Sequence, residues 1–407
     1  MPAPQSFPAV GPQQKIRHRL ELTGFSLALA YALLLASCVV QGYWLIDGAG
    51  AIIAYDFVNV WAAGKLVLDG RAAAAYDWTL HRDIEVVAVG HDFDGYYGWH
   101  YPPTFLFAAA ALAALPYLAA VLVWLAVTLP AYLAAVRAIM GERIGIVLGC
   151  AFPGVIWNFS VGQNGFLTAA LIGGMLANLP RRPLVSGIFL GLLTYKPQFG
   201  ILFPLVLALD GRWRVLAAAA ATAALMVAAS LIAYGPDSWR AFFEWMPVTS
   251  AAVFADGRAG LNKLQSLFGT VRWLGGSMTA AWIAHGLLVA GATMALAYLW
   301  RRPVRYEIKA AALAAASLLA TPYLYIYDFP VLAVPLAFLL RLGLREGFLS
   351  FEWPAIAAAC GLILVFPVLA MPTGFAAAVM VAAVIARRAA AEGGFARSRS
   401  GAEAVAA

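Results

Sequence analysis

Long apolar segments separated by short polar ones dominate this chain. Six of them carry few or no charges and approach the roughly 20 residues that a membrane-spanning helix needs: Gly24–Ile46, Tyr117–Val136, Arg214–Tyr234, Met278–Trp300, Trp353–Ala370 and Thr373–Ala386. Shorter apolar segments fill the gaps: Arg143–Phe159, Asn164–Leu179, Leu184–Tyr195, Gln198–Leu209, Ile308–Thr321 and Tyr327–Leu340. The pattern predicts an all-α, polytopic membrane protein with about 12 transmembrane helices.

The composition agrees with this class. Hydrophobic residues make up 63% of the chain and charged residues 12%, whereas soluble domains carry roughly 25% charged residues. Each of the three cysteines, Cys38, Cys150 and Cys360, lies in an apolar segment, where a free thiol behaves as a small hydrophobic group. We therefore expect neither a disulfide nor a cysteine-based metal framework. The first apolar segment lacks a signal-peptide cleavage pattern and is expected to be a retained helix.

The distribution of Lys and Arg predicts the orientation, because the cytoplasmic flanks of membrane helices carry an excess of both. Twelve crossings from a cytoplasmic N-terminus leave 19 of the 27 Lys and Arg residues on the cytoplasmic side. The two segments flanking Lys196 are together only long enough for one tilted helix, but merging them would move 12 basic residues outside. We therefore expect two short crossings that turn at Lys196 on the outer side, with both termini in the cytoplasm.

The net charge of +7 is then explained by the excess of Lys and Arg on the cytoplasmic side. The chain has no basic stripe with interleaved aromatic residues, so we expect no nucleic-acid partner. We expect one transmembrane domain over 24–388, between cytoplasmic tails at 1–23 and 389–407, in the plasma (inner) membrane. The composition of the terminal stretches, Met1–Gln14 and Ala389–Ala407, predicts disorder. The oligomeric state is not readable from the sequence.

Two outer loops, Asp47–His100 and Gly235–Gly276, are much longer than the other outer turns. In the first, apolar residues at helical spacing run from Phe57 to Leu68 and end at Asp69-Gly70. They predict a short amphipathic helix lying at the membrane interface. Asp56 directly precedes this helix, so its carboxylate is either a helix cap or a functional group.

Further polar motifs fall on the same outer side. They are Trp99-His100-Tyr101-Pro102-Pro103, Gly162-Gln163-Asn164, Tyr195-Lys196-Pro197-Gln198 and the stretch from Thr321 to Asp328. Each has a structural explanation when taken alone: turn glycines, a snorkelling lysine, or an aromatic belt at the interface. Their gathering on one face predicts a functional site there.

The set of motifs resembles glycosyltransferase family 87, whose members use polyprenyl-phosphate sugars. The matching residues follow the family's order: Asp56-Phe57, Trp61-Ala62-Ala63-Gly64, Leu68-Asp69-Gly70, Tyr76-Asp77, Tyr101-Pro102-Pro103, Gly162-Gln163-Asn164, Lys196-Pro197-Gln198 and Tyr327-Asp328. The resemblance implies a GT-C membrane fold and a lipid-linked donor, commonly polyprenyl-phosphate mannose. It also implies inverting transfer on the outer face to a lipid or glycan acceptor, with Asp56 as the catalytic base.

The residue types suit this chemistry. An inverting transfer needs a carboxylate to take the proton of the acceptor hydroxyl, and the leaving lipid phosphate needs a nearby cation. The candidates for binding the donor phosphate are Lys196, Arg258 and Lys263. Candidates for contacting the sugar or the acceptor are Tyr101, Gln163, Asn164, Gln198, Tyr327 and Asp328; the two tyrosines would stack on the sugar ring and the others would hydrogen-bond hydroxyls.

We expect no metal ion and no other cofactor. Asp92-Phe93-Asp94 has the spacing that binds a divalent cation beside nucleotide sugars, but such donors are cytoplasmic and this pair lies in an outer loop. His81, His91 and His100 lack the short helical spacing of a zinc site.

Two other interpretations remain open at this stage. A transporter or flippase would use Lys196 and the interrupted helices around it as a substrate path, although the chain has no clear internal repeat. A transferase fold without activity would act as an assembly partner.

Overall fold

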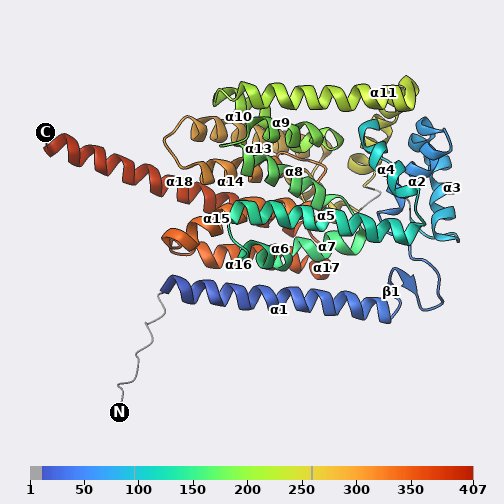
Figure 1. Cartoon of the computed structure of the whole chain (residues 1–407), viewed down its shortest axis with the longest axis horizontal. Coiled ribbons are helices and arrows are strands. Elements are labelled where there is room, and N and C mark those ends of the chain that lie inside the picture. Colours follow the sequence, from blue (N-terminus) through green and yellow to red (C-terminus); the bar gives the residue numbers. More distant parts are fainter. Residues whose placement is uncertain (1–11, 96, 258–259, 407) are drawn as a thin grey trace, which may run out of the picture.

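The structure is a computed structural model that describes residues 12–95, 97–257 and 260–406. Most helices lie side by side along the long axis of the molecule (Figure 1). The β-structure of the described residues is a two-stranded antiparallel pair, β1 (Tyr43–Trp44) and β2 (Ile46–Asp47), with one isolated bridge beside it. The all-α class is therefore confirmed.

Six helical segments within the described residues are long and apolar enough to cross a membrane. They are α1 (Pro12–Val40), α5 (Tyr117–Met140), α11 (Trp213–Ser250), α13 (Met278–Trp300), the pair η7 (Ile326–Leu332) and α15 (Ala333–Glu346), and α18 (Thr373–Ala406). A seventh would be the pair α6 (Ile144–Ala151) and α7 (Gly154–Val161), bent by 66°. The expected count of 12 is not confirmed.

The remaining expected crossings are shorter helices. They are α8 (Gly165–Asn178), α9 (Pro183–Leu192), α10 (Phe203–Leu209), α14 (Tyr306–Leu319) and α16 (Glu352–Leu364), with α17 (Phe366–Leu369) after the last. A helix of 14 residues is only about 21 Å long, less than the roughly 30 Å hydrocarbon core. These helices fill the bundle without reaching the full length of a span.

The chain reverses direction at Lys196. Gly187 and Gly191 of α9 approach Val215 and Ala219 of α11 in the same order along the chain, so the two helices run parallel. The chain must therefore return between them, and it does so through η4 (Pro197–Gly200) and α10. The hairpin that the sequence predicted around Lys196 is present. Its first arm is α9, and η3 (Leu193–Tyr195) is the last turn of that arm.

α11 continues beyond its expected end. Gly235 breaks the helix with φ 73° and ψ 165°, at the boundary predicted between a span and the second outer loop. The chain then stays helical to Ser250 and forms η5 (Ala251–Ala255), η6 (Leu261–Lys263) and α12 (Leu267–Trp273). The second loop is therefore largely helical.

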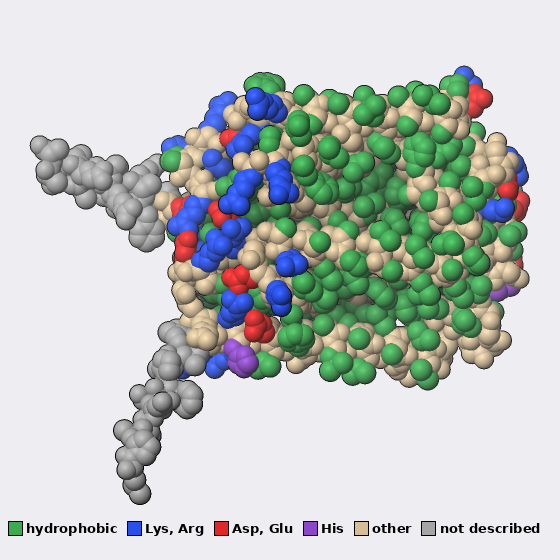
Figure 2. Space-filling model, viewed as in Figure 1, with side chains coloured by type: hydrophobic (Ala, Val, Ile, Leu, Met, Phe, Trp, Pro, Cys, Tyr) green, Lys and Arg blue, Asp and Glu red, His purple; other side chains and the backbone are tan. Residues whose placement is uncertain are grey.

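The bundle has two chemically different ends. We call one the basic end; Arg17 pairs there with Glu142, Arg305 with Glu346, and Arg388 with Glu352. Lys and Arg side chains gather at this end beside a broad hydrophobic band (Figure 2). The first loop lies at the opposite end, which we call the loop end (Figure 1).

The described part of the chain begins and ends with helix at the basic end. α1 starts at Pro12, inside the expected tail 1–23, and α18 continues to Ala406, through the tail expected to be disordered from 389. Alanine and arginine, which are frequent in this last stretch, have high helix propensity.

At the loop end, α2 (Val58–Leu68) is the short helix predicted from the sequence. It is packed between η1 (Ala72–Tyr76), α3 (Trp78–Val89) and α4 (Leu106–Ala113), which η2 (Pro103–Phe105) precedes. Eight of its eleven residues are buried, including Asn59, so neighbouring protein elements cover most of this helix. A Cβ on Gly64 would lie 2.0 Å from the carbonyl oxygen of Ala109, so only glycine permits this packing.

Candidate active site

Asp56 lies in the segment that leads into α2, against the turn between α7 and α8. The backbone N–H of Phe57 donates to the carbonyl of Val161 at 3.2 Å. Gly162, with φ 67°, ends α7, and a Cβ there would lie 2.9 Å from the Cβ of Phe57. A glycine at this turn is therefore what brings Asp56 beside Gln163.

The carboxylate of Asp56 does not cap α2. The cap position is Phe57, and no side chain accepts a hydrogen bond from the first turn. The residue as a whole is partly exposed, and its carboxylate has a hydrogen bond with the amide of Gln163. The helix-cap role that the sequence left open for Asp56 is therefore not observed.

The orientation of Gln163 is set by its other contacts. Its Oε1 accepts hydrogen bonds from the Tyr101 hydroxyl at 3.1 Å and from the Asn164 backbone N–H at 3.2 Å. Because the oxygen is occupied by two donors, the NH₂ group is left to donate to Asp56. Tyr101 is in turn held by its carbonyl, which accepts from the Tyr76 hydroxyl at 2.9 Å.

The surroundings of Asp56 raise its pKa. Burial raises the pKa of Asp56 to about 6, while the Lys263 charge and the Gln163 hydrogen bond lower it and the Asp328 charge raises it further. A carboxylate with this pKa is mostly ionised at neutral pH yet more basic than an ordinary aspartate. Both properties suit a general base.

Lys196 and Asp328 form a buried ion pair. Lys196 Nζ lies 2.5 Å from Asp328 Oδ1, and the two residues are 4% and 1% exposed. The other oxygen, Asp328 Oδ2, accepts from the backbone N–H of Tyr325 at 3.1 Å. The charge of Lys196 is thus already met by an anion, which the sequence did not predict, and the pair ties the α9–α10 hairpin to η7.

Asn158 connects the same loop to the Gln163 turn. Its Nδ2 donates to the carbonyls of Gln163 at 2.9 Å and Tyr327 at 3.1 Å. A Cβ on Gly165 would lie 2.0 Å from the Tyr327 oxygen, so the two segments are in close contact. The sequence analysis missed both residues; a lone asparagine inside an apolar segment, four residues before Gly162, was the available signal.

Lys263 is the cation placed to act on Asp56. It ends η6, its side chain is exposed, and its charge lowers the pKa of Asp56. Arg258, the third expected phosphate ligand, lies outside the described residues. Gln198 is partly exposed in η4, and among the described residues no hydrogen bond or charge interaction links it to Asp56.

Tyrosines surround the carboxylate. Its charge raises the pKa values of Tyr97 and Tyr325 together with burial, the larger cause in both. The rings of Tyr325 and Tyr327 stack at 5.4 Å, and Lys196 Nζ lies 5.7 Å from the Tyr327 ring. The ring of Tyr101 is enclosed by other aromatic side chains: Trp99, Phe105 and Tyr195. Its hydroxyl, rather than its face, is therefore directed to the site.

Asn164 is available to a ligand. It stands at the start of α8 without capping it, and its side-chain Oδ1 and Nδ2 are buried without hydrogen-bond partners in the described part of the chain. Buried amides are normally satisfied. A bound sugar hydroxyl would supply the missing partner.

The Asp92-Phe93-Asp94 turn is occupied by protein contacts. Asp92 Oδ1 accepts from Arg82 Nη2 at 2.8 Å and from the Phe93 N–H at 2.9 Å. Burial lowers the pKa of His81 to about 3 and that of His100 to about 4, so both are neutral at physiological pH. Within the residues that the structure describes, no group of three or more His, Cys, Asp or Glu side chains has the arrangement of a metal site.

Comparison with known proteins gives the chain its family. The sequence model of glycosyltransferase family 87 matches residues 99–322, more than half of the chain. The chain belongs to glycosyltransferase family 87. No curated protein and no solved structure matches it. The matched region contains the Tyr101, Gln163 and Lys196 motifs, and Asp56 lies before it. Membership of family 87 makes this chain a membrane glycosyltransferase, in preference to the transporter and the inactive partner considered above.

Proposed function

We propose that this family 87 protein transfers a sugar, mannose in the first instance, from a polyprenyl-phosphate donor to a hydroxyl of a lipid or glycan acceptor. Transfer inverts the anomeric centre and takes place at the loop end, which faces the extracytoplasmic side. The observation that carries the proposal is Asp56: a carboxylate that caps no helix, has a raised pKa, and lies beside a glutamine with a fixed orientation.

In the proposed step, an oxygen of Asp56 takes the proton of the acceptor hydroxyl. The acceptor oxygen forms a bond to the anomeric carbon while the bond from that carbon to the phosphate oxygen breaks, and polyprenyl phosphate leaves with the electron pair. Gln163 holds the carboxylate in place. Asn164 binds a sugar hydroxyl through its free amide.

The leaving phosphate needs a cation that is not already paired. Lys263 meets this requirement among the described candidates, because it is exposed and its charge reaches Asp56. Lys196 is our second candidate, since its ammonium group is already paired with the carboxylate of Asp328. We propose that Lys196 and Asp328 chiefly position η7 and the sugar-facing Tyr327.

The experiment is sugar transfer from radiolabelled polyprenyl-phosphate mannose to a lipid and glycan extract of the source organism. Asp56→Asn should reduce transfer by at least a hundredfold while the protein stays folded and binds donor. The matched control is Asp69→Asn, because Asp69 pairs with Lys65 on the exposed side of α2, and it should transfer at the wild-type rate.

An Asp56→Asn protein with full activity would disprove the catalytic assignment. If the wild type binds the donor but transfers nothing, the sugar or the acceptor is wrong. If it does not bind the donor at all, the polyprenyl-phosphate assignment fails.

A further inference from the structure

A deep apolar groove runs along the outside of the bundle, away from the Asp56 site. It lies between α13, α14 and α18 and has a volume of about 1120 Å³. Small side chains create it, such as Ala292 and Ala295 on α13 and Ala315 on α14. A Cβ on Gly291 would meet no atom within 4 Å, so the space beside α13 is open.

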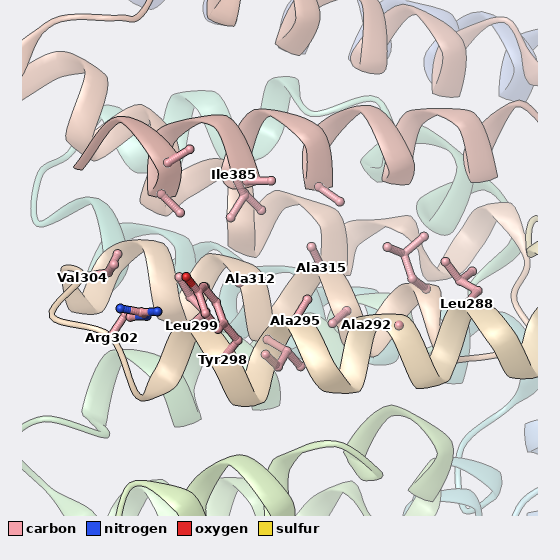
Figure 3. Close-up of a pocket in the computed structure, with 18 of the residues that line it drawn as sticks. Leu288, Ala292, Ala295, Tyr298, Leu299, Arg302, Val304, Ala312, Ala315 and Ile385 are labelled. Atoms are coloured by element: carbon pink, nitrogen blue, oxygen red, sulfur yellow. The ribbon is translucent and has the colours of Figure 1, made fainter. Parts of the chain in front are cut away.

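The groove has one apolar end and one cationic end. Leu288 lies at one end, and Arg302 with Val304 at the other (Figure 3). Arg302 is the only charged residue among those that line the groove. It lies two residues after the end of α13, at the basic end of the bundle.

The guanidinium of Arg302 lacks an anionic partner. Its Cζ lies 4.6 Å from the centre of the Tyr298 ring, and among the described residues it forms no ion pair. By contrast, the neighbouring Arg305 is paired with Glu346 and Glu392, and Lys309 Nζ donates to the carbonyl of Trp300. A guanidinium without an anionic partner can bind a lipid phosphate, and the apolar groove beside it can bind the acyl chains of the same lipid.

We propose that this groove binds an anionic phospholipid of the leaflet at the basic end, with acyl chains along α13 and the phosphate on Arg302. No Asp or Glu lines the groove to meet the ammonium group of a zwitterionic lipid. The reacting phosphate of the proposed sugar donor belongs at Asp56, at the other end of the bundle. The lipid is therefore a separate ligand, and its binding does not depend on the proposed transfer reaction.

The test is lipid retention by the purified full-length protein. The protein is exchanged into mixed micelles with equal amounts of phosphatidylglycerol and phosphatidylcholine, washed with detergent, and examined by native mass spectrometry. The wild type should retain phosphatidylglycerol about fivefold more than phosphatidylcholine, the size expected for one arginine at a lipid headgroup. Arg302→Gln should remove this preference, and Arg301→Gln, whose side chain does not line the groove, should keep it.

A second pair of variants tests the groove itself. Gly291→Phe fills the open space and should abolish retention of phosphatidylglycerol. Gly286→Phe places the same ring on α13 outside the groove, also in open space, and should leave retention unchanged. The proposal is overturned if the wild type shows no lipid preference, if Arg302→Gln still prefers phosphatidylglycerol, or if polyprenyl phosphate displaces the phospholipid, which would make the groove a donor-chain site.

Discussion

Asp56 is controlled by a small number of identifiable neighbours. Burial raises its pKa to about 6, and the Gln163 hydrogen bond lowers it. Because the ionised form is the base, transfer should rise about tenfold per pH unit below pH 6 and level off above pH 7. Initial rates between pH 4.5 and 8 measure this dependence.

Gln163→Leu provides the companion measurement. Removing a hydrogen bond to the ionised form raises the pKa, so the rising part of the profile should move to higher pH. The variant should therefore lose more activity at pH 6 than at pH 8. A profile that is flat over the whole range, or that moves to lower pH in the variant, would contradict this account of Asp56.

The Lys196–Asp328 pair leads to a prediction about the stability of the protein. Removing one partner leaves the other charge buried, which costs about 3–5 kcal/mol. Lys196→Met and Asp328→Asn should each lower the melting temperature of the detergent-solubilised protein substantially. The double variant should lose much less than the sum of the two. Additive losses would mean that the two residues do not interact.

The sequence identified most of these residues but not their relations. Asp56, Gln163, Asn164, Lys196 and Asp328 all stood out as polar groups in apolar surroundings. Their pairing depends on which turns meet in space, and Lys196 is 132 residues from Asp328. Both were therefore predicted as free ligands. Asn158, whose two hydrogen bonds join the Gln163 and Tyr327 segments, had no motif to mark it.

At the scale of elements, α2 decides where Asp56 lies. Gly64→Ala would force a Cβ to within 2.0 Å of the Ala109 oxygen, so it should destabilise the protein by about 1–3 kcal/mol and reduce transfer. Gly286→Ala is the control, because its Cβ meets nothing within 4 Å and alanine is the better helix former. Melting temperatures of the two variants measure the difference. Equal stability would show that α2 and α4 can separate at no cost.

The periodicity of apolar residues predicted the start of α2 to within one residue. It did not predict that most of the helix is buried. Asn59 is polar and was therefore expected to be exposed, yet it is buried in a helix against which η1, α3 and α4 pack. Helix length was also misleading. Apolar segments of about 12–16 residues were expected to cross the membrane, but several form helices that are shorter than a full span, so the expected count of 12 is not confirmed.

Lys and Arg side chains gather at one end of the molecule (Figure 2), and the first loop, which carries Asp56, lies at the other (Figure 1). We predict that the basic end is cytoplasmic. In a variant without native cysteines, Asp83→Cys on α3 should react with a membrane-impermeant thiol reagent in intact cells. Arg181→Cys, between α8 and α9, should react only after lysis. Both side chains are exposed, so the reverse pattern would invert the assigned orientation.

The long separation between Lys196 and Asp328 also bears on how the protein is made. Ribosomes deliver Lys196 to the membrane well before Asp328 has been synthesised, so the nascent α9–α10 hairpin must wait in the translocon or remain close to water. The charge of Lys196 gains its Asp328 partner only when η7 has been synthesised. A chain cut short before residue 328 would keep the Asp56 carboxylate but expose an uncompensated charge to the lipid, which quality-control proteases can recognise and remove.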